Sequence, residues 1–531
     1  MTTVAELLQQ GRRDEVWKKY CGFLDLNLQE YMDIQERLLM EQIGLLSRCE
    51  LGRKLLRNQV PTSVEEFRSQ TPLTTYDDYL PFLLDRNPAP LPRPPAFWAR
   101  SSGRSSEFGF KWVAYSKEMT RKVGEFIVTS FLLASCSGRG DVQLNIGEYI
   151  LFTLAPPPYF SGVLAHELQD QLQLIFLPSL AEGDKMDFEQ RIETGFRLAL
   201  KSQVDLFYGL SSLLVAIGER FAEGSGNVKF SLDMLDPRLI FRFIRGLAVS
   251  KLQHRNLLPK DLWKIKGIVV GGMDTSFYVD AIEALWGKKP LEGYGGTELG
   301  GIAMQAWNYK GMTFLPDYNF LEFITEEDFW NSMSEDGYSD KQPRTLLLNE
   351  LTPGGIYELV ITNFHGGVFT RYRTGDLIQI IALRDEELNI NTPQMVFYTR
   401  ADGVIDLAGF TRLTEKSIST AIWEAGVSTN GWTVRKEYDN EKPFLHLYLE
   451  PKSDLEVDES RLAIHRKLKD KDPGYADLEG MLGFNPLVVT ILPKGAFERY
   501  MDFKRANGAD LAHIKPPRVN PTDQALAILI K

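Results

Sequence analysis

The sequence predicts an α/β fold with a large N-terminal domain and a smaller α+β C-terminal domain. Between residues 117 and 285, strand-like and helix-like patterns alternate, as in a largely parallel sheet with helices on both faces. The segment 266–272, Lys-Gly-Ile-Val-Val-Gly-Gly, has the apolar, β-branched centre of a buried parallel strand. After Arg400 the pattern changes to scattered short strands and helices. We therefore expect a domain boundary at 400–403, between domains of residues 1–400 and 401–531.

Composition limits the classes of function. A chain of 531 residues is too long for one hydrophobic core, and its 44% hydrophobic and 25% charged residues are typical of a globular protein. The net charge of -11 argues against a nucleic-acid partner, because phosphate backbones require clustered Lys and Arg. An anionic substrate such as a nucleotide would then need a local cationic pocket.

Three scattered cysteines, Cys21, Cys49 and Cys136, fit no metal-ligand spacing and suit a reducing compartment. The N-terminus lacks the pattern of a signal peptide. The longest apolar run, 126–136, is about half of what a membrane span requires and predicts a buried helix. We therefore expect a cytoplasmic protein without a membrane partner, monomeric or weakly dimeric.

Hydrophobic periodicity and helix-capping residues predict the positions of the other helices and strands. Ser63, followed three residues later by Glu66, predicts a helix start, and the proline-rich stretch 88–95 predicts a stiff connector. Helices are expected within 4–60 and at 187–200, 213–221, 415–424 and 459–468. Strands are expected at 149–154, 204–208, 355–362, 377–381, 404–408, 443–450 and 486–493.

The first candidate site is the serine- and glycine-rich loop 100–111. Backbone N–H groups and hydroxyls of Ser101, Ser102 and Gly103 can converge on an anion, and Lys111 can add positive charge. An ordinary loop is the alternative interpretation.

Glycines mark the second candidate region. Gly272 ends the predicted strand at 266–272, where a ligand can approach the backbone closely. In the segment 292–300, Tyr294 offers a flat ring, Thr297 a hydroxyl and Glu298 a carboxylate suited to Mg²⁺. A glycine-rich turn from a strand to a helix is the alternative.

The third region is 369–377, Phe-Thr-Arg-Tyr-Arg-Thr-Gly-Asp-Leu. It combines an aromatic ring with Arg371 and Arg373, and Arg400 follows at the end of the next strand. We expect Gly375-Asp376 to form a turn between two strands, where the carboxylate can accept hydrogen bonds from a ribose diol. The alternative is an Asx turn that caps its own backbone.

These three stretches, in this order and followed by Arg400-Ala-Asp-Gly, resemble the adenylate-forming superfamily of acyl-CoA ligases and luciferases. Within it the chain most resembles the auxin-responsive acyl acid amido synthetases, the Gretchen Hagen family. The resemblance rests on Pro72-Leu-Thr-Thr-Tyr-Asp-Asp-Tyr, on Tyr357-Glu-Leu-Val-Ile-Thr leading into 371–376, on Thr392-Pro-Gln-Met-Val-Phe, and on the stretches 495–502 and 513–519. It covers the chain from residue 72 nearly to the end.

The resemblance implies a large N-terminal domain of α/β sheets with a β-barrel-like subdomain, and a small mobile C-terminal domain. It implies that ATP and Mg²⁺ activate a small carboxylic acid as an acyl-AMP, which then reacts with an amino acid. By position, Ser101, Ser102 and Gly103 would hold phosphates, Tyr294 would face the adenine, Thr297 would contact the α-phosphate, Glu298 the magnesium and Asp376 the ribose. Lys111, Gly272, Gly295 and Gly296 would also belong to the nucleotide-binding site. Arg400, Arg412 and Lys515 would supply further cationic contacts.

By the same analogy, Phe160, Tyr208 and Phe277 would line the acid pocket, although aromatic residues at such positions more often belong to a core. The chain departs from the family at Arg104, where the phosphate loop usually carries Thr or Ser. Arg104 leaves open a nucleotide-binding homologue with impaired catalysis. A CoA ligase that forms a thioester also stays open, because it would use the same site residues. The tail favours amide formation, because a Gly-Lys-Ile motif typical of CoA ligases is absent from the sequence.

Overall fold

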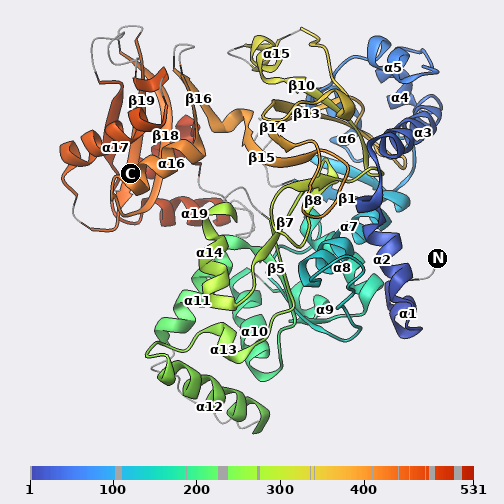
Figure 1. Ribbon diagram of the computed structural model, residues 1–531. Helices are drawn as coiled ribbons and strands as arrows, with labels where there is room; N and C mark the ends of the chain where they lie inside the picture. The colour runs from blue at the N-terminus through green and yellow to red at the C-terminus, as the bar shows by residue number, and fades with distance from the viewer. Residues whose placement is uncertain are drawn as a thin grey trace. The chain divides into compact units, whose positions relative to one another are not determined.

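The computed structural model describes residues 3–101, 111–186, 188–224, 237–271, 275–334, 337–339, 341–407, 411–439, 442–453, 455–472, 474–476, 485–506 and 517–531. The chain forms two compact units (Figure 1). The first unit contains Met1–Thr374 and Ile378–Phe397, and the second contains Gly375–Leu377 and Tyr398–Lys531.

A single large sheet organises the first unit. Its strand order in the described residues is β10 (Asn319–Thr325), β13 (Ile356–Asn363), β14 (Tyr372–Ala382), β15 (Gln394–Arg400), β9 (Met312–Phe314), β8 (Gly300–Gln305), β7 (Pro290–Gly296), β6 (Gly267–Gly271), β5 (Leu206–Leu210), β3 (Tyr149–Phe152) and β4 (Ile175–Leu177). The pairs from β4 to β7 are parallel, whereas β7–β8, β8–β9, β9–β15 and β10–β13 are antiparallel. The predicted α/β fold class is therefore confirmed, and β7 joins its parallel and antiparallel parts.

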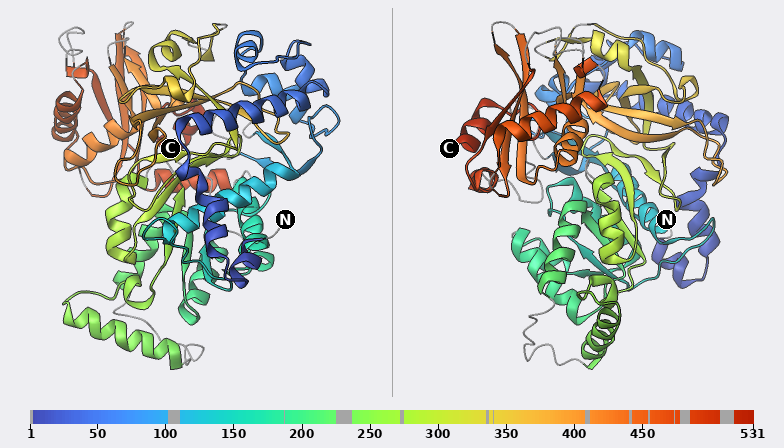
Figure 2. Two further views of the ribbon diagram at one scale, coloured as in Figure 1. Left: turned by 45° about the vertical axis from the view of Figure 1, so that its right-hand side comes forward. Right: turned by 60° about the vertical axis from the view of Figure 1, so that its left-hand side comes forward.

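Side chains that alternate along the strands build a core on each face of the parallel part. On β6, Ile268 and Val270 belong to one buried cluster and Val269 to another, because successive residues of a strand face opposite sides. Helices cover both faces: α7 (Lys117–Ser135) and α8 (Phe160–Leu172) on one, and α11 (Ser211–Gly224) and α14 (Thr275–Trp286) on the other (Figures 1 and 2). The predicted buried helix at 126–136 is confirmed within α7.

Other helices of the first unit surround this framework. They are α1 (Val4–Gln9), α2 (Arg13–Cys21), α3 (Leu28–Leu46), α4 (Glu50–Leu55), α5 (Val64–Gln70), α6 (Leu80–Leu83), α9 (Leu180–Gly183), α10 (Phe188–Lys201), α12 (Pro237–Leu252), α13 (Pro259–Leu262) and α15 (Glu326–Asn331). Helix α5 begins as predicted, since Ser63 Oγ accepts a hydrogen bond from the N–H of Glu66. The Glu66 carboxylate bonds Thr62 instead of completing the expected capping box.

A small α+β fold forms the second unit. It contains β16 (Val404–Leu407), β17 (Thr411–Thr414), α16 (Glu415–Glu424), β18 (Thr429–Asp439), β19 (Lys442–Pro451), α17 (Val457–Lys471), β20 (Leu487–Ile491), α19 (Ala496–Ala506) and α20 (Asp523–Ile530). Strands β18, β19 and β20 form one sheet, with β19 and β20 parallel. Their inward residues and helices α16 and α17 share a buried cluster, so this unit has its own core.

One local prediction was wrong. Gly375 and Asp376 lie inside strand β14, not in a turn between two strands; the chain reverses earlier, between β13 and β14. The segment after β7 leads into β8, so it is a hairpin, which excludes the alternative interpretation of 292–300 as a turn from a strand to a helix. Among the described residues, no helix is long and apolar enough to cross a membrane.

Candidate functional site

A short antiparallel pair of strands flanks residues 102–110, which lie outside the described residues. Strands β1 (Pro95–Arg100) and β2 (Trp112–Ser116) pair in register, with Arg100 opposite Trp112. Beyond them, the N–H of Ser101 donates to the Lys111 carbonyl at 2.9 Å, and the N–H of Lys111 donates to Ser101 Oγ at 2.8 Å. Ser101 and Lys111 are thus fixed where the loop begins and ends. Ser102, Gly103 and Arg104 lie outside the described residues.

The ammonium group of Lys111 lies among three other side chains. Its Nζ is 3.1 Å from Tyr372 Oη and 3.4 Å from Glu298 Oε1. It also lies 5.1 Å from the ring centroid of Tyr76 and 5.8 Å from that of Tyr372. Only 13% of the Lys111 side chain and 20% of the Glu298 side chain are exposed, so both charges are poorly solvated. The structure therefore brings parts of all three predicted regions together at Lys111.

Tyr76 was not predicted as a site residue, although its segment contributed to the family resemblance. Its hydroxyl donates to the Trp112 carbonyl at 2.9 Å and accepts from the Trp112 N–H at 2.8 Å. Burial raises its pKa to about 12, so the phenol stays neutral. The neighbouring Thr74 bonds the backbone of Arg371 and Arg373. This pairing ties the segment 72–79 to the start of β14.

Side chains hold the carbonyls of the β7–β8 hairpin. Tyr115 Oη donates to the Thr297 carbonyl at 2.6 Å, and Asn363 Nδ2 donates to the Glu298 carbonyl at 3.1 Å. Asn319 Nδ2 donates to the Leu299 carbonyl at 2.7 Å. No local sequence pattern identifies these supports, because they come from distant strands. They fix the backbone that carries Thr297 and Glu298.

Close packing also explains glycines in this hairpin. A Cβ on Gly295 would lie 2.3 Å from the Gly300 carbonyl oxygen, and Gly300 has a φ of +63°. The preceding Tyr294 is 9% exposed, and its ring centroid lies 5.7 Å from that of Phe397. Tyr294 is therefore an anchored ring at the end of β7, next to the close contact at Gly295. Gly272 lies outside the described residues.

Asp376 pairs with Arg400 within the second unit. Arg400 Nε lies 3.1 Å from Asp376 Oδ1, and Arg400 ends strand β15 as predicted. The Asp376 side chain is 11% exposed and that of Arg400 33%. The two oxygens of the Asp376 side chain are hydrogen-bond acceptors, as a ribose diol would require.

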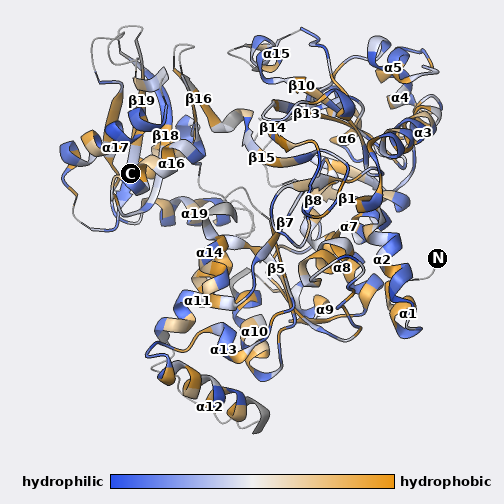
Figure 3. Ribbon diagram, viewed as in Figure 1, coloured by the Kyte–Doolittle hydropathy of each residue, from blue (hydrophilic) through white to orange (hydrophobic). Residues whose placement is uncertain are grey.

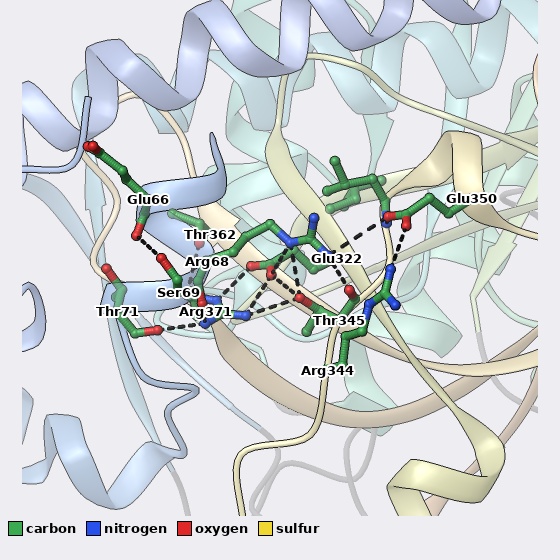
Figure 4. Close-up of polar contacts among 12 residues, drawn as sticks. Glu66, Arg68, Ser69, Thr71, Glu322, Arg344, Thr345, Glu350, Thr362 and Arg371 are labelled. Carbon is green, nitrogen blue, oxygen red and sulfur yellow. Dashed lines mark hydrogen bonds and ion pairs between the residues drawn. The ribbon is translucent and has the colours of Figure 1, made fainter. Parts of the chain in front are cut away.

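Arg371 is held in a buried polar network (Figure 4). Its Nε donates to Glu322 Oε2 at 3.0 Å and its Nη2 donates to Glu322 Oε1 at 2.8 Å. Its Nη1 donates to the carbonyls of Arg68 and Thr71, each at 2.6 Å, and Nη2 also donates to Thr345 Oγ1 at 3.1 Å. These bonds occupy the guanidinium group, so Arg371 is a structural residue that fixes the start of β14.

Arg373, the second residue of β14, is held in the same manner. Its Nε and Nη2 donate to Glu358 Oε2 at 2.9 and 2.6 Å, and Nη2 also donates to Ser332 Oγ at 2.9 Å. Its guanidinium lies 3.8 Å from the ring centroid of Tyr338. Arg371 and Arg373 thus neutralise buried glutamates, whereas Arg400 pairs with Asp376.

Two of the three expected pocket residues are described. Tyr208 is buried in β5 with its ring centroid 5.3 Å from that of Phe152, and Phe160 begins α8 with its ring centroid 5.6 Å from that of Tyr115. The Tyr115 ring that contacts Phe160 also carries the hydroxyl that donates to the Thr297 carbonyl. Phe277 lies in α14 and Arg412 in β17, opposite Asp406, but their side chains lie outside the described part of the chain. Lys515 is also outside it.

Comparison with solved structures identifies the class of fold. This chain matches AtGH3.15 acyl acid amido synthetase in complex with 2,4-DB, with a TM-score of 0.69 and 19% identity over 97% of this chain and 95% of that chain. A 2-hydroxyisobutyryl-CoA ligase in the postadenylation state matches with a TM-score of 0.53 and 12% identity over 92% of this chain and 90% of that chain. The chain therefore shares the fold of these two enzymes.

Within this class, residues 312–400 match the GH3 family central domain and residues 414–524 the GH3 family C-terminal domain. These two segments are therefore similar to the corresponding domains of GH3 proteins. A jasmonoyl–L-amino acid synthetase, GH3.5 of Oryza sativa subsp. japonica, is 28% identical over 49% of this chain and 46% of its own length. A second jasmonoyl–L-amino acid synthetase, JAR4 of Nicotiana attenuata, is 25% identical over 49% of this chain and 44% of its own length. This chain spans about half the length of the curated relatives it matches.

Proposed function

We propose that this protein uses ATP to activate a small carboxylic acid and then joins the acyl group to an amino acid. The observation that carries the proposal is the position of Lys111, which contacts Glu298 and Tyr372 where the three predicted regions meet. The relatives' name, jasmonoyl–L-amino acid synthetase, supports the same reaction.

The proposed reaction has two steps. A carboxylate oxygen of the acid attacks the α-phosphorus of ATP, the bond to the bridging oxygen breaks, and pyrophosphate leaves. The amine of the amino acid then attacks the acyl carbon of the acyl-AMP; AMP leaves and the amine loses a proton. Since the first step develops negative charge on phosphoryl oxygens, positioned cations and N–H donors lower its barrier.

Each predicted residue has a role in this proposal. Lys111 and the loop that follows Ser101 would bind phosphates, and the anchored hairpin would place Thr297 against the α-phosphate. Ser102 and Gly103 would also bind phosphates, and Gly272, Tyr294, Gly295 and Gly296 would contact the adenine. Asp376 and Arg400 would bind the ribose, and Arg412 and Lys515 of the smaller domain would contact phosphate. The pocket for the acid would be lined by Phe160, Tyr208 and Phe277. Residues 401–531 would act as the mobile domain.

Glu298 fits the demands of Mg²⁺ bound together with a nucleotide. Such magnesium ions usually take one or two protein carboxylates and complete their shell with phosphates and water. In the described residues, no group of three or more His, Cys, Asp or Glu side chains could hold a metal by itself. Glu298, in a fixed hairpin beside a phosphate-binding lysine, is the carboxylate that would hold the ion. When bound, Mg²⁺ would neutralise charge on the phosphates.

Exchange of labelled pyrophosphate into ATP tests the first step. The proposal predicts exchange that depends on one or a few acids from a panel of jasmonate-like, indole-acetate-like and benzoate-like compounds. Absence of exchange with every acid, by a protein that binds ATP, would favour the impaired homologue. With the effective acid, AMP release that requires an amino acid and ignores CoA would support amide formation, whereas release that requires CoA would identify a thioester-forming ligase. We further expect a cytoplasmic protein that is monomeric or weakly dimeric.

A further inference from the structure

We propose that helix α12 docks the first unit onto an anionic lipid surface. Four of its apolar or small residues, Phe241, Ile244, Ala248 and Leu252, follow one another at intervals of three and four residues and therefore share one side of the helix. Phe241 is 68% exposed, Ile244 60% and Leu252 82%. Hydrophobic side chains this exposed on consecutive turns form a continuous apolar stripe, which is a mark of an interaction surface.

The opposite side of α12 packs against the rest of the first unit. Phe243 and Ser250 are buried, and a Cβ added to Gly246 would lie 2.8 Å from Leu257 Cδ1 and 3.2 Å from Leu262 Cδ2. The helix thus packs closely on the segment that leads into α13. The exposed stripe is a second apolar side of the helix, which takes no part in these packing contacts. In Figures 1 and 3, α12 lies at the edge of the first unit and carries hydrophobic residues along its length.

Helix α12 and the segment that follows it are rich in positive charge. The stretch 237–260 contains six Lys or Arg residues and no Asp or Glu, in a chain whose net charge is -11; Asp236 and Asp261 flank it, and Asp261 pairs with Arg255. Arg245 and Lys251, both exposed, flank the apolar stripe on its two sides. Long cationic side chains can place their charge at the level of lipid headgroups while their methylene groups cover apolar surface. The stripe and its cations therefore fit a lipid surface, in which negatively charged headgroups cover an apolar interior.

An anionic bilayer is the partner that this arrangement fits. A helix of 16 residues is about 24 Å long, shorter than the roughly 30 Å of bilayer hydrocarbon, so α12 would lie in the interface plane. Amphipathic helices with basic flanks bind in this way, and the cytoplasmic leaflet supplies the negative surface potential. This proposal revises the expectation that the protein has no membrane partner.

Sedimentation of the full-length protein with vesicles tests the proposal. We expect binding to vesicles that contain phosphatidylserine, weak binding to phosphatidylcholine alone, and loss of binding as salt rises. Because each Lys or Arg near such a surface strengthens binding about fivefold, the double variant R245E/K251E should bind at least about 25-fold more weakly. F241Q/L252Q should also lose binding, because it removes the inserting side chains. Both variants should retain the thermal unfolding temperature of the parent protein, since these side chains are exposed.

Matched controls come from the second unit, where Trp423 is 77% exposed and Lys416 is also exposed. W423Q and K416E should bind vesicles like the parent protein. Three results would overturn the proposal: no sedimentation with phosphatidylserine vesicles, equal binding to both kinds of vesicle, or equal losses in the controls. Concentration-dependent dimerisation that F241Q/L252Q abolishes, without vesicle binding, would instead assign this side of α12 to a second copy of the chain.

Discussion

Lys111 Nζ lies 3.4 Å from Glu298 Oε1, which joins the end of the serine-rich loop to the hairpin after β7. The two residues are 187 positions apart in the sequence, and neither local pattern alone indicates a site. In this geometry, a phosphate bound to Lys111 and a cation bound to Glu298 would be immediate neighbours. The contact is therefore the structural basis for assigning ATP to this part of the first unit.

Replacing Lys111 tests its role toward phosphate. We expect K111M to lower the rate of pyrophosphate exchange by about 10²–10³-fold, because a well-placed donor in a poorly solvated site is lost. K117M, which changes an exposed lysine at the start of α7, is the matched control and should retain the parent rate. Equal thermal unfolding of the two variants would show that the loss is not a folding defect. Unchanged exchange by a folded K111M protein would remove Lys111 from the site.

Asp376 is expected to accept the ribose hydroxyls. D376A should abolish measurable adenylation and weaken ATP binding, because it removes both acceptor oxygens, whereas D376N should retain partial binding through its remaining carbonyl oxygen. Isothermal titration with ATP and with 2′-deoxy-ATP measures this contribution. If Asp376 contacts the diol, D376A should bind the two nucleotides equally; a preference for ATP that survives the substitution would contradict the assignment.

Glu298 is expected to set the requirement for magnesium. E298Q removes the negative charge but keeps the shape of the side chain, so the Mg²⁺ concentration for half-maximal exchange should rise at least tenfold. The Lys111 contact should persist as a hydrogen bond, which leaves the stability nearly unchanged. An unaltered magnesium dependence would show that another group holds the ion.

The Arg371–Glu322 pair is expected to stabilise the fold. R371M leaves Glu322 as a buried charge without its main partner and should lower the free energy of unfolding by about 3–5 kcal/mol, measured by urea denaturation. Arg344 pairs with Glu350 nearby, but its side chain is 77% exposed (Figure 4). R344M should therefore cost no more than about 1 kcal/mol. Similar losses for both variants would contradict the structural role of Arg371.

Glu167 predicts a pH-dependent component of stability. Burial at the contact between α8 and α7, and then repulsion by Asp170, raise the pKa of Glu167 to about 7, against the opposing effect of His166. The folded state thus binds this proton more tightly than the unfolded state. Its contribution is fully present below the ordinary glutamate pKa and is lost as the pH rises to about 7.

Relative to the parent protein, E167Q should therefore gain stability progressively between about pH 4.5 and 7, and the difference should level off above pH 7. Urea denaturation across this range measures the difference. E182Q, at an exposed position, serves as a control and should show no comparable trend. A constant difference between E167Q and the parent protein at all pH values would rule out this titration.

Local patterns predicted the elements whose signals are local. The apolar run in α7 and the β-branched centre of β6 are buried along most of their length, so composition alone sufficed. The hairpin after β7 was missed because its partner strand, Gly-Gly-Ile-Ala-Met-Gln, has little β-sheet propensity, and cross-strand contacts such as Gly293 opposite Met304 hold it in place.

The candidate site shows the same limit. The three motifs could be found from residue types, and the structure joins Lys111, Glu298 and Tyr372. The sequence could not show that Arg371 and Arg373 neutralise buried glutamates, because Glu322 and Glu358 lie on β10 and β13 within ordinary strand patterns. Tyr76, Tyr115 and Asn363 were missed for the same reason, since only the fold brings them to the site.

A crystal structure with a non-hydrolysable acyl-adenylate analogue tests the central claim most directly. The account predicts adenylate density against Tyr294 and the β7–β8 hairpin, its phosphate-mimicking group within reach of Thr297 and Lys111, and its ribose hydroxyls on Asp376. An analogue that bound with none of these residues in contact would contradict the assignment of ATP-dependent acid activation to this site.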